Sequence, residues 1–192
     1  MNIVYFDLET QKLFQDVGGR SNIHRLKLAV GVTYSTERED YAVYLEKDAD
    51  ALIAELTSAD AVVGFNIKAF DYVVLSPYVK EGTSLWKIRS VDMMEHIYRA
   101  LGFRVSLDSL AEATLGEKKS ADGIQSVQWF KAGQIDRVIE YCKKDVEVTR
   151  RLYKHGAENG FVYFKDRYGR RKNIRVNWKI QKVGKWLFRY KE

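Results

Sequence analysis

The sequence predicts an α/β domain with a mixed central sheet and helices on both faces. Short apolar segments rich in β-branched and aromatic residues occur at 3–7, 61–65 and 88–91, a composition typical of strands buried on both faces. Two further strand-like segments, 26–34 and 41–45, flank a polar tip and predict a hairpin or meander. Helical spacing of apolar residues is found in most of the remaining chain. Strands that come first in a meander and then alternate with helices give this fold class.

The helices are predicted from apolar residues spaced three or four positions apart and from residues that cap helix ends. Asp48 and Asp92 are predicted to cap the helices that follow them, and Ser106 opens a helix that ends at Gly116. Few periodic apolar residues occur at 11–25, which predicts a loop. The predicted helices cover residues 49–58, 69–78, 93–100, 107–115, 134–153 and 179–190.

The chain of 192 residues is long enough for one domain with its own core and a small appendage. Its single cysteine, Cys142, excludes an internal disulfide and fits a reducing compartment. The first ten residues contain two acids and no basic segment, which argues against a secretory signal peptide. No apolar segment approaches the roughly 18–20 residues of a transmembrane helix. We therefore expect a cytoplasmic protein with no membrane partner.

Positive charge is concentrated towards the C-terminal end. Residues 161–192 carry eleven Lys or Arg and two acids, a net charge of +9, whereas residues 1–160 carry a net charge of −3. Strand-like segments at 161–164 and 174–178 flank a basic tip at 167–172, which predicts a hairpin. We expect a main domain at 1–160 and a basic hairpin and helix at 161–192. The charge favours an anionic partner for this appendage, with nucleic acid ahead of membrane.

Two carboxylates lie at the end of the first predicted strand. Asp7 and Glu9 are two positions apart, so their side chains point to the same face of the sheet. An unpaired carboxylate in a buried strand costs several kcal/mol unless a positive group compensates it, and no Lys or Arg occurs in the next two residues. Either the strand end is exposed and the acids are solvated, or a cation binds there.

Two later segments carry acids that are expected at the same edge of the sheet. Asp71 lies in the opening turns of the helix that follows the strand at 61–65, and crevices in open α/β sheets form beyond the carboxyl ends of strands. Its alternative role is an acid that interacts with the helix dipole. Tyr141 and Asp145 are four positions apart and share one face of the longest helix. Asp145 could instead serve only to accept the hydroxyl of Tyr141.

Together these residues form an ordered set: Asp-x-Glu on a first strand, Asn-x4-Asp after a later strand, and Tyr-x3-Asp on a late helix. The set resembles the motifs of the DEDDy subgroup of DnaQ-like, RNase-H-like 3′–5′ exonucleases, and is closest to the proofreading domains of family B DNA polymerases. It implies the RNase-H-like fold, with the second strand antiparallel to the rest. The resemblance spans residues 1–155 and rests on Phe6-Asp7-Leu8-Glu9-Thr10, Gly64-Phe65-Asn66-Ile67 with Phe70-Asp71, and Tyr141-x3-Asp145-x3-Thr149.

The resemblance implies a two-metal hydrolysis of single-stranded DNA or RNA from the 3′ end. Oxygen ligands without His or Cys suit Mg²⁺ or Mn²⁺. By this resemblance Asp7 bridges two ions, Glu9 and Asp145 hold the ion that activates the attacking water, and Asp71 supports the other ion. Tyr141 orients the water, because a phenol with a pKa near 10 is a poor base at pH 7. The alternatives are a non-catalytic nucleic-acid-binding module on the same fold and a structure-specific endonuclease.

Polar and basic residues outside the acidic set are candidates for nucleic-acid contact. Asn66 is expected to contact the terminal nucleotide, with helix capping as the alternative. The basic residues of the polar loop at 118–123 could neutralise substrate phosphates or could simply be solvated. The basic tip of the C-terminal hairpin is expected to bind phosphates outside the active site, with a protein partner as the alternative. The candidate nucleic-acid-binding residues are Asn66, Lys118, Lys119, Arg170, Arg171 and Lys172.

Overall fold

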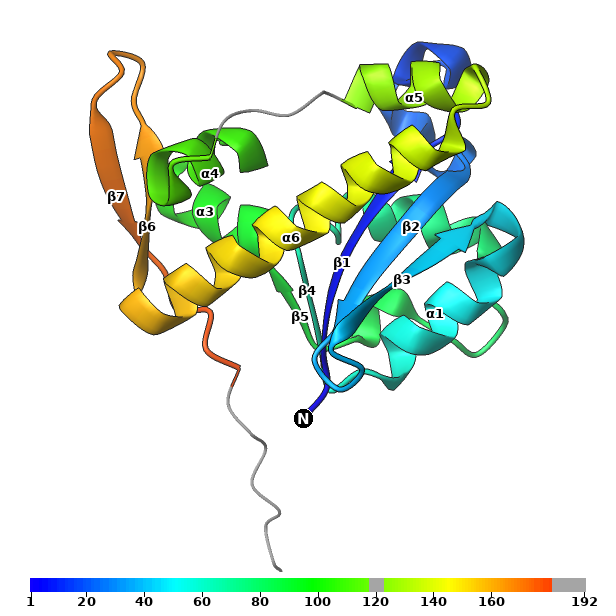
Figure 1. Ribbon diagram of the computed structural model, residues 1–192, viewed down its shortest axis with the longest axis horizontal. Helices are drawn as coiled ribbons and strands as arrows, with labels where there is room; N and C mark the ends of the chain where they lie inside the picture. Colours follow the sequence, from blue (N-terminus) through cyan, green and yellow to red (C-terminus); the bar gives the residue numbers. More distant parts are fainter. Residues whose placement is uncertain (118–122, 181–192) are drawn as a thin grey trace, which may run out of the picture.

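The computed structural model describes residues 1–117 and 123–180, which fold around a five-stranded sheet (Figure 1). Its strands are β1 (Ile3–Thr10), β2 (Leu28–Ser35), β3 (Asp40–Leu45), β4 (Ala61–Gly64) and β5 (Ser90–Asp92). They lie in the order β3-β2-β1-β4-β5. Strand β2 is antiparallel to β1 and β3, whereas β4 is parallel to β1 and β5. This confirms the mixed sheet and the antiparallel second strand that the sequence predicts.

Helices cover both faces of the sheet, as predicted. The α-helices of the described residues are α1 (Ala49–Ser58), α2 (Asp71–Leu75), α3 (Met93–Leu101), α4 (Leu107–Leu115), α5 (Gly123–Lys131) and α6 (Ile135–Asn159). The long helix α6 crosses one face of the sheet and α1 packs on the other (Figure 1). Helix α5 lies near the start of α6, beyond the carboxyl end of β1 (Figure 1).

Strand β1 supplies side chains to both cores because alternate residues of a strand point to opposite faces. Val4, Phe6 and Leu8 are buried in the core beneath α1 and α2. Tyr5 is buried in the other core, which is formed with α6. The two acids that follow Tyr5 at intervals of two therefore face α6. The end of β4 approaches β1 closely, since a Cβ added at Gly64 would lie 2.9 Å from the carbonyl oxygen of Phe6.

Several predicted elements differ from the observed ones. Residues 11–25 were expected to be a loop but contain two 3₁₀ helices, Phe14–Val17 and Arg20–Arg25. The helix expected at 69–78 is split into α2 and a 3₁₀ turn that contains Pro77, which has no backbone N–H for a continued helix. Helix α5 was not predicted. Helix α6 extends six residues beyond the expected end at residue 153, to Asn159, and is followed by Gly160 in the left-handed conformation.

Of the two aspartates predicted to cap a helix, only one does so through its side chain. Asp92 accepts a hydrogen bond from the backbone N–H of Glu95 at 3.2 Å and caps α3 as predicted. Asp48 immediately precedes α1, but its carboxylate accepts from the backbone N–H of Leu45 instead of from α1. The prediction of a side-chain cap at Asp48 was therefore wrong, although the position of the helix was right.

The basic hairpin forms a separate two-stranded sheet of β6 (Phe161–Lys165) and β7 (Arg171–Arg175), which packs against α4. The expected second strand at 174–178 was misplaced, so Arg171 and Lys172 lie in β7 and not in the tip. The turn is shorter than expected because the carboxylate of Asp166 accepts hydrogen bonds from the backbone N–H groups of Tyr168 and Arg170, at 2.9 and 3.0 Å. Strand β7 therefore begins at Arg171.

The chain continues past β7 to Trp178, whose ring packs on Gly156 of α6. Most of the helix predicted at 179–190 lies outside the described residues, and the domain boundary at residue 160 stays a prediction. Within the described ranges, no helix combines the length and the apolar character needed to cross a membrane. The cytoplasmic location likewise stays a prediction.

Candidate metal centre

Three carboxylates from two elements meet above the carboxyl end of β1. Asp7 and Glu9 project from β1 towards α6, and Asp145 projects from α6 towards β1. One oxygen of each lies within 4.8 Å of the others. Glu9 is buried, while Asp7 and Asp145 are half-buried. The sheet edge is therefore not an exposed strand end with solvated acids.

Asp71, the fourth acid of the predicted set, lies beside this triad. It is the first residue of α2 and is only 2% exposed. The backbone N–H groups of Asp71 itself and of Leu8 lie near its carboxylate and oppose the rise of its pKa. Its Oδ1 atom is buried and has no hydrogen-bond partner. A buried, unpartnered carboxylate oxygen is costly, which points to a missing ligand at this position.

Burial holds the pKa values of the four acids above the ordinary range, and neighbouring carboxylates add to the rise. Burial raises the pKa of Asp7 well above its usual value, and the negative charges of Asp71, Asp145 and Glu9 add to this. Burial, again assisted by neighbouring acids, raises the pKa of Glu9 to about 8, that of Asp71 to about 8 and that of Asp145 to about 7. Burial and like charges both disfavour the ionised form.

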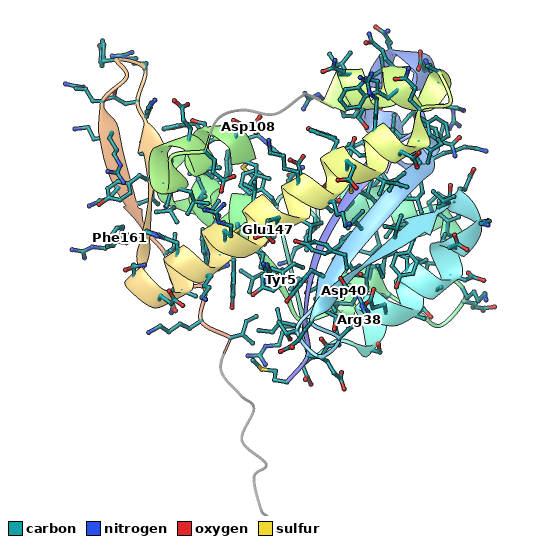
Figure 2. All side chains as sticks on the ribbon, in the orientation of Figure 1. Tyr5, Arg38, Asp40, Asp108, Glu147 and Phe161 are labelled. Carbon is teal, nitrogen blue, oxygen red and sulfur yellow. The ribbon has the colours of Figure 1, made fainter. Side chains whose placement is uncertain are left out.

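No ion pair joins any of these four acids to a Lys or Arg in the part of the chain that the structure describes. A fifth acid, Asp108 on α4 (Figure 2), adds negative charge that raises the pKa of Asp145. Four clustered oxygen ligands without a compensating side chain fit a hard divalent cation such as Mg²⁺ or Mn²⁺. The donor set and the unpartnered oxygen of Asp71 are both consistent with such an ion.

Tyr141 lies one turn before Asp145 on α6, as the sequence predicts. The phenol faces the Asp145 carboxylate and lowers the pKa of that carboxyl. The ring packs edge-on against Trp129 of α5, with centroids 6.2 Å apart. Burial, followed by the negative charges of Asp145, Glu9 and Asp7, raises the pKa of Tyr141, so the phenol stays protonated.

Cys142 is buried next to Asp7, with its sulfur 3.4 Å from the Asp7 carbonyl oxygen and 3.5 Å from Oδ2. Burial and the nearby acids raise the pKa of the thiol, so it stays neutral and donates its proton. It is the small buried residue that the sequence indicates. Its weak hydrogen bonds help to fix the rotamer of Asp7.

A cavity of about 310 Å³ opens beside the carboxylates. Asp7, Glu9 and Asp71 line one side of it, and Asn66 lies at its edge. The remaining wall is largely apolar and comes from both sides of the acids. It includes Leu13, Phe14, Leu26, Phe65, Phe70, Ile124 and Val127. The combination of an acidic side and an apolar wall suits a ligand that has both a charged and a planar apolar part.

Helix α5 covers this cavity, although the sequence was not assigned a helix there. Ile124 and Val127 line the cavity, and the buried hydroxyl of Ser126 faces Glu9 and opposes the rise of its pKa. Lys131 at the end of α5 forms an ion pair at 2.8 Å with Asp16. The helix could have been predicted, because Ile124, Val127 and Phe130 recur every three residues.

The three predicted contact residues of the hairpin, Arg170, Arg171 and Lys172, are not gathered at the acids. Lys118 and Lys119 lie outside the described residues. The hairpin lies at the far end of α6 from α5 (Figure 1). There Arg170 forms an ion pair with Asp166 at 2.9 Å, and the guanidinium of Arg171 lies 3.6 Å from the centre of the Tyr163 ring. Lys172 on β7 is exposed.

The mixed five-stranded sheet, with acids at the end of its first strand and on the long helix that crosses it, defines an RNase-H-like protein. The family model described as the RNase_H superfamily matches residues 4–157, and the chain belongs to this superfamily. A search of the curated proteins finds no match. Membership indicates a nuclease-type hydrolase that acts on nucleic acid, a class that generally uses divalent metal ions.

Proposed function

We propose that the protein is a metal-dependent 3′–5′ exonuclease that removes nucleotides from single-stranded DNA or RNA. The observation that carries this proposal is the set of Asp7, Glu9 and Asp145 within 4.8 Å, with buried Asp71 beside it and the phenol of Tyr141 facing Asp145. These residues match the complete DEDDy set of the sequence. A purely binding module would not need four carboxylates gathered at one site without a compensating cation.

The four carboxylates would hold two Mg²⁺ or Mn²⁺ ions. When bound, these ions supply Lewis acidity for hydrolysis of a phosphodiester bond. By the family resemblance, Asp7 would contribute to both ions, Glu9 and Asp145 to one of them, and Asp71 to the other. Binding of the cations would lower the pKa values of all four acids and remove their mutual repulsion.

Tyr141 has a positioning role in this proposal. Its phenol is neutral, since its pKa is raised by burial and by the acids, and therefore it cannot act as a base at neutral pH. It can donate and accept one hydrogen bond each, which is sufficient to hold the attacking water in line with the scissile bond. Trp129 fixes the ring from the other side.

The cavity beside the acids would hold the terminal nucleotide, with its base against the apolar wall and Asn66 at the edge. Lys118 and Lys119, in the segment before α5, are proposed to contact substrate phosphates. Arg170, Arg171 and Lys172 are proposed to bind phosphates far from the chemistry. A protein partner for this basic hairpin is the alternative.

The direct test is digestion of 5′-labelled single-stranded DNA and RNA with Mn²⁺, alongside a circular single strand. We expect products that shorten one nucleotide at a time from the 3′ end, an intact circle, and no cleavage by Asp7→Ala. Cleavage of the circle would identify an endonuclease. Binding without any cleavage by the wild type would identify a binding module.

A further inference from the structure

A second cavity, of about 340 Å³, opens towards the amino end of β1, away from the acids at its carboxyl end. Strands β1 and β2 contribute Tyr5 and Tyr34 to its lining, and the turn between β2 and β3 contributes Thr36 and Glu39. Tyr5 lies on the side of the sheet that α6 crosses (Figure 2), and α6 supplies the rest of the lining. No residue lines both this cavity and the one beside the acids. The two are therefore separate sites.

Three cations of α6 line this second cavity, namely Arg150, Arg151 and Lys154. Lys154 follows the two arginines by four and three positions, so the three side chains are neighbours on the helix surface. Like charges at this spacing destabilise a helix unless something negative compensates them. The arrangement therefore favours an anion in the cavity.

The acids that pair with these cations leave hydrogen-bond donors unused. Arg150 donates to Glu147 through Nε and Nη2, at 3.0 and 3.1 Å. Arg151 pairs with Glu117 through Nη1. A guanidinium has five N–H donors, so both arginines retain donors that these pairs do not use. No ion pair joins Lys154 to an acid in the ranges 1–117 and 123–180.

The guanidinium of Arg150 is held in place by a chain of contacts. Tyr41 donates to the carboxylate of Glu147 at 2.5 Å, and this carboxylate is the one that binds Arg150. The guanidinium also lies 4.2 Å from the centre of the Tyr34 ring. That ring packs edge-on against Tyr41, with centroids 5.1 Å apart. A cation that is already positioned loses little conformational freedom when a ligand binds.

The lining contains one acid, Glu39, which comes from a different wall than the cations. It is exposed, and no ion pair among the described residues connects it to the three cations of the same cavity. A carboxylate accepts hydrogen bonds from hydroxyl and amino groups. A ligand that combines an anionic group with such donors can therefore use both walls.

The size of the cavity limits what it can hold. A volume of about 340 Å³ is at the lower end of the range of roughly 300–1,000 Å³ that is usual for small-molecule sites. The lining has a net charge of +2, from three cations and one acid. Guanidinium groups match the geometry of phosphate oxygens, and aromatic rings beside them add apolar surface. These features suit one phosphorylated nucleoside.

We propose that the second cavity binds a small phosphomonoester of the nucleoside monophosphate class. The phosphate contacts the cations of α6, and the sugar hydroxyl or base amino groups donate to Glu39. The rings of Tyr5 and Tyr34 provide the apolar part of the lining. This site is independent of the proposed exonuclease activity, because none of its residues belongs to the acidic cluster.

Calorimetric titration of the metal-free protein in EDTA tests the proposal with inorganic phosphate, adenosine 5′-monophosphate and adenosine. EDTA removes the metal ions through which a phosphate could bind at the acids. Phosphate and the nucleotide should bind, the nucleotide more tightly, and adenosine should not. Lys154→Ala should weaken binding of both phosphorylated ligands by on the order of 10-fold, as expected for one lost charge-assisted hydrogen bond.

Three further variants sharpen the test. Lys154→Glu places a carboxylate one turn from Arg150, where the two pair, and should abolish binding. Glu39→Ala should reduce the advantage of the nucleotide over phosphate. Lys47→Ala is the matched control, because Lys47 is an exposed cation beyond the other end of β3 from Glu39. It should keep wild-type affinities. Lys154 is exposed, so its variants should unfold at the wild-type temperature without ligand, which a melting scan checks.

The outcomes that would overturn the proposal are specific. If neither phosphate nor the nucleotide binds the wild type at millimolar concentration, the cavity is not a phosphate site. Wild-type affinity in Lys154→Glu would place the ligand elsewhere on the protein. Binding of a 5′-phosphorylated oligonucleotide, without binding of phosphate or the nucleotide, would make this surface a strand contact. All of these measurements are made without metal, so failure of the exonuclease assay leaves their interpretation unchanged.

Discussion

Replacing Asp145 by asparagine should stabilise the metal-free protein at alkaline pH. Burial, together with neighbouring acids, raises the pKa values of Glu9, Asp71 and Asp145 to about 8, 8 and 7. Groups with raised pKa values bind more protons in the folded than in the unfolded protein. Their contribution to stability is therefore complete below pH 4 and is lost as pH rises through about 7 to 8.

The size of this effect follows from the shift of one group. A carboxyl whose pKa rises from 3.8 to about 7 loses on the order of 4 kcal/mol of folding free energy across that range. The acids interact, so they titrate as one set and their separate losses do not add. Water in the adjoining cavity screens part of the repulsion. For Asp145→Asn we expect a gain of about 1–2 kcal/mol at pH 8, or roughly 2–8 °C in melting temperature.

Thermal unfolding in EDTA between pH 5 and pH 8 is the assay, repeated with Mn²⁺. The wild type should lose stability as pH rises and regain it with Mn²⁺, since a ligand that binds only the folded state stabilises it. Asp145→Asn should lose less and should show no Mn²⁺ shift. Asp136→Asn, on the exposed first turn of α6, is the control and should keep the Mn²⁺ shift. A drop in metal-free stability at pH 8 for Asp145→Asn would refute the reasoning and make Asp145 a structural acceptor for Tyr141.

Three further predictions concern catalysis, substrate binding and packing. Tyr141→Phe should slow hydrolysis by on the order of 10²-fold while the Mn²⁺ shift in melting temperature stays close to wild type; unchanged turnover would leave the residue a packing role. Changing Arg170, Arg171 and Lys172 to Ala should weaken strand binding and flatten its salt dependence by about 0.7 per lost phosphate contact, with turnover at saturation unchanged. If affinity and salt slope both persist, a protein partner is the better interpretation of the hairpin. Gly64→Ala should cost about 1–3 kcal/mol in urea unfolding, because the new methyl group meets the backbone of β1.

The parts of the fold that sequence predicts best are those fixed by local patterns. Asp7 and Glu9 share a face because strand geometry alone dictates it, and Tyr141 and Asp145 share one because helix geometry does. That these two pairs lie close together in space could be expected only from the family resemblance and from the tendency of open α/β sheets to form crevices beyond the carboxyl ends of their strands. The structure adds the distances between the carboxylate oxygens, the burial of the side chains, and the absence of a hydrogen-bond partner for Oδ1 of Asp71 among the described residues.

Features that depend on distant contacts could not be predicted in this way. Arg104 and Asn66 are 38 residues apart, and nothing in either segment indicates that their side chains meet. The start of β7 depends on hydrogen bonds from the tip to Asp166, which strand propensity does not report. Helix α5 is a different case, because Ile124, Val127 and Phe130 carry the apolar spacing of a helix in the sequence itself.

The central claim is that the acidic cluster performs metal-dependent removal of nucleotides from a 3′ end. Its most direct test is to strip the protein with EDTA and follow a 5′-labelled single strand as Mn²⁺ is added back. The account predicts no product without metal and, with Mn²⁺, a ladder that shortens one nucleotide at a time from the 3′ end. Cleavage that persists in EDTA, or products that begin with internal cuts, would contradict it.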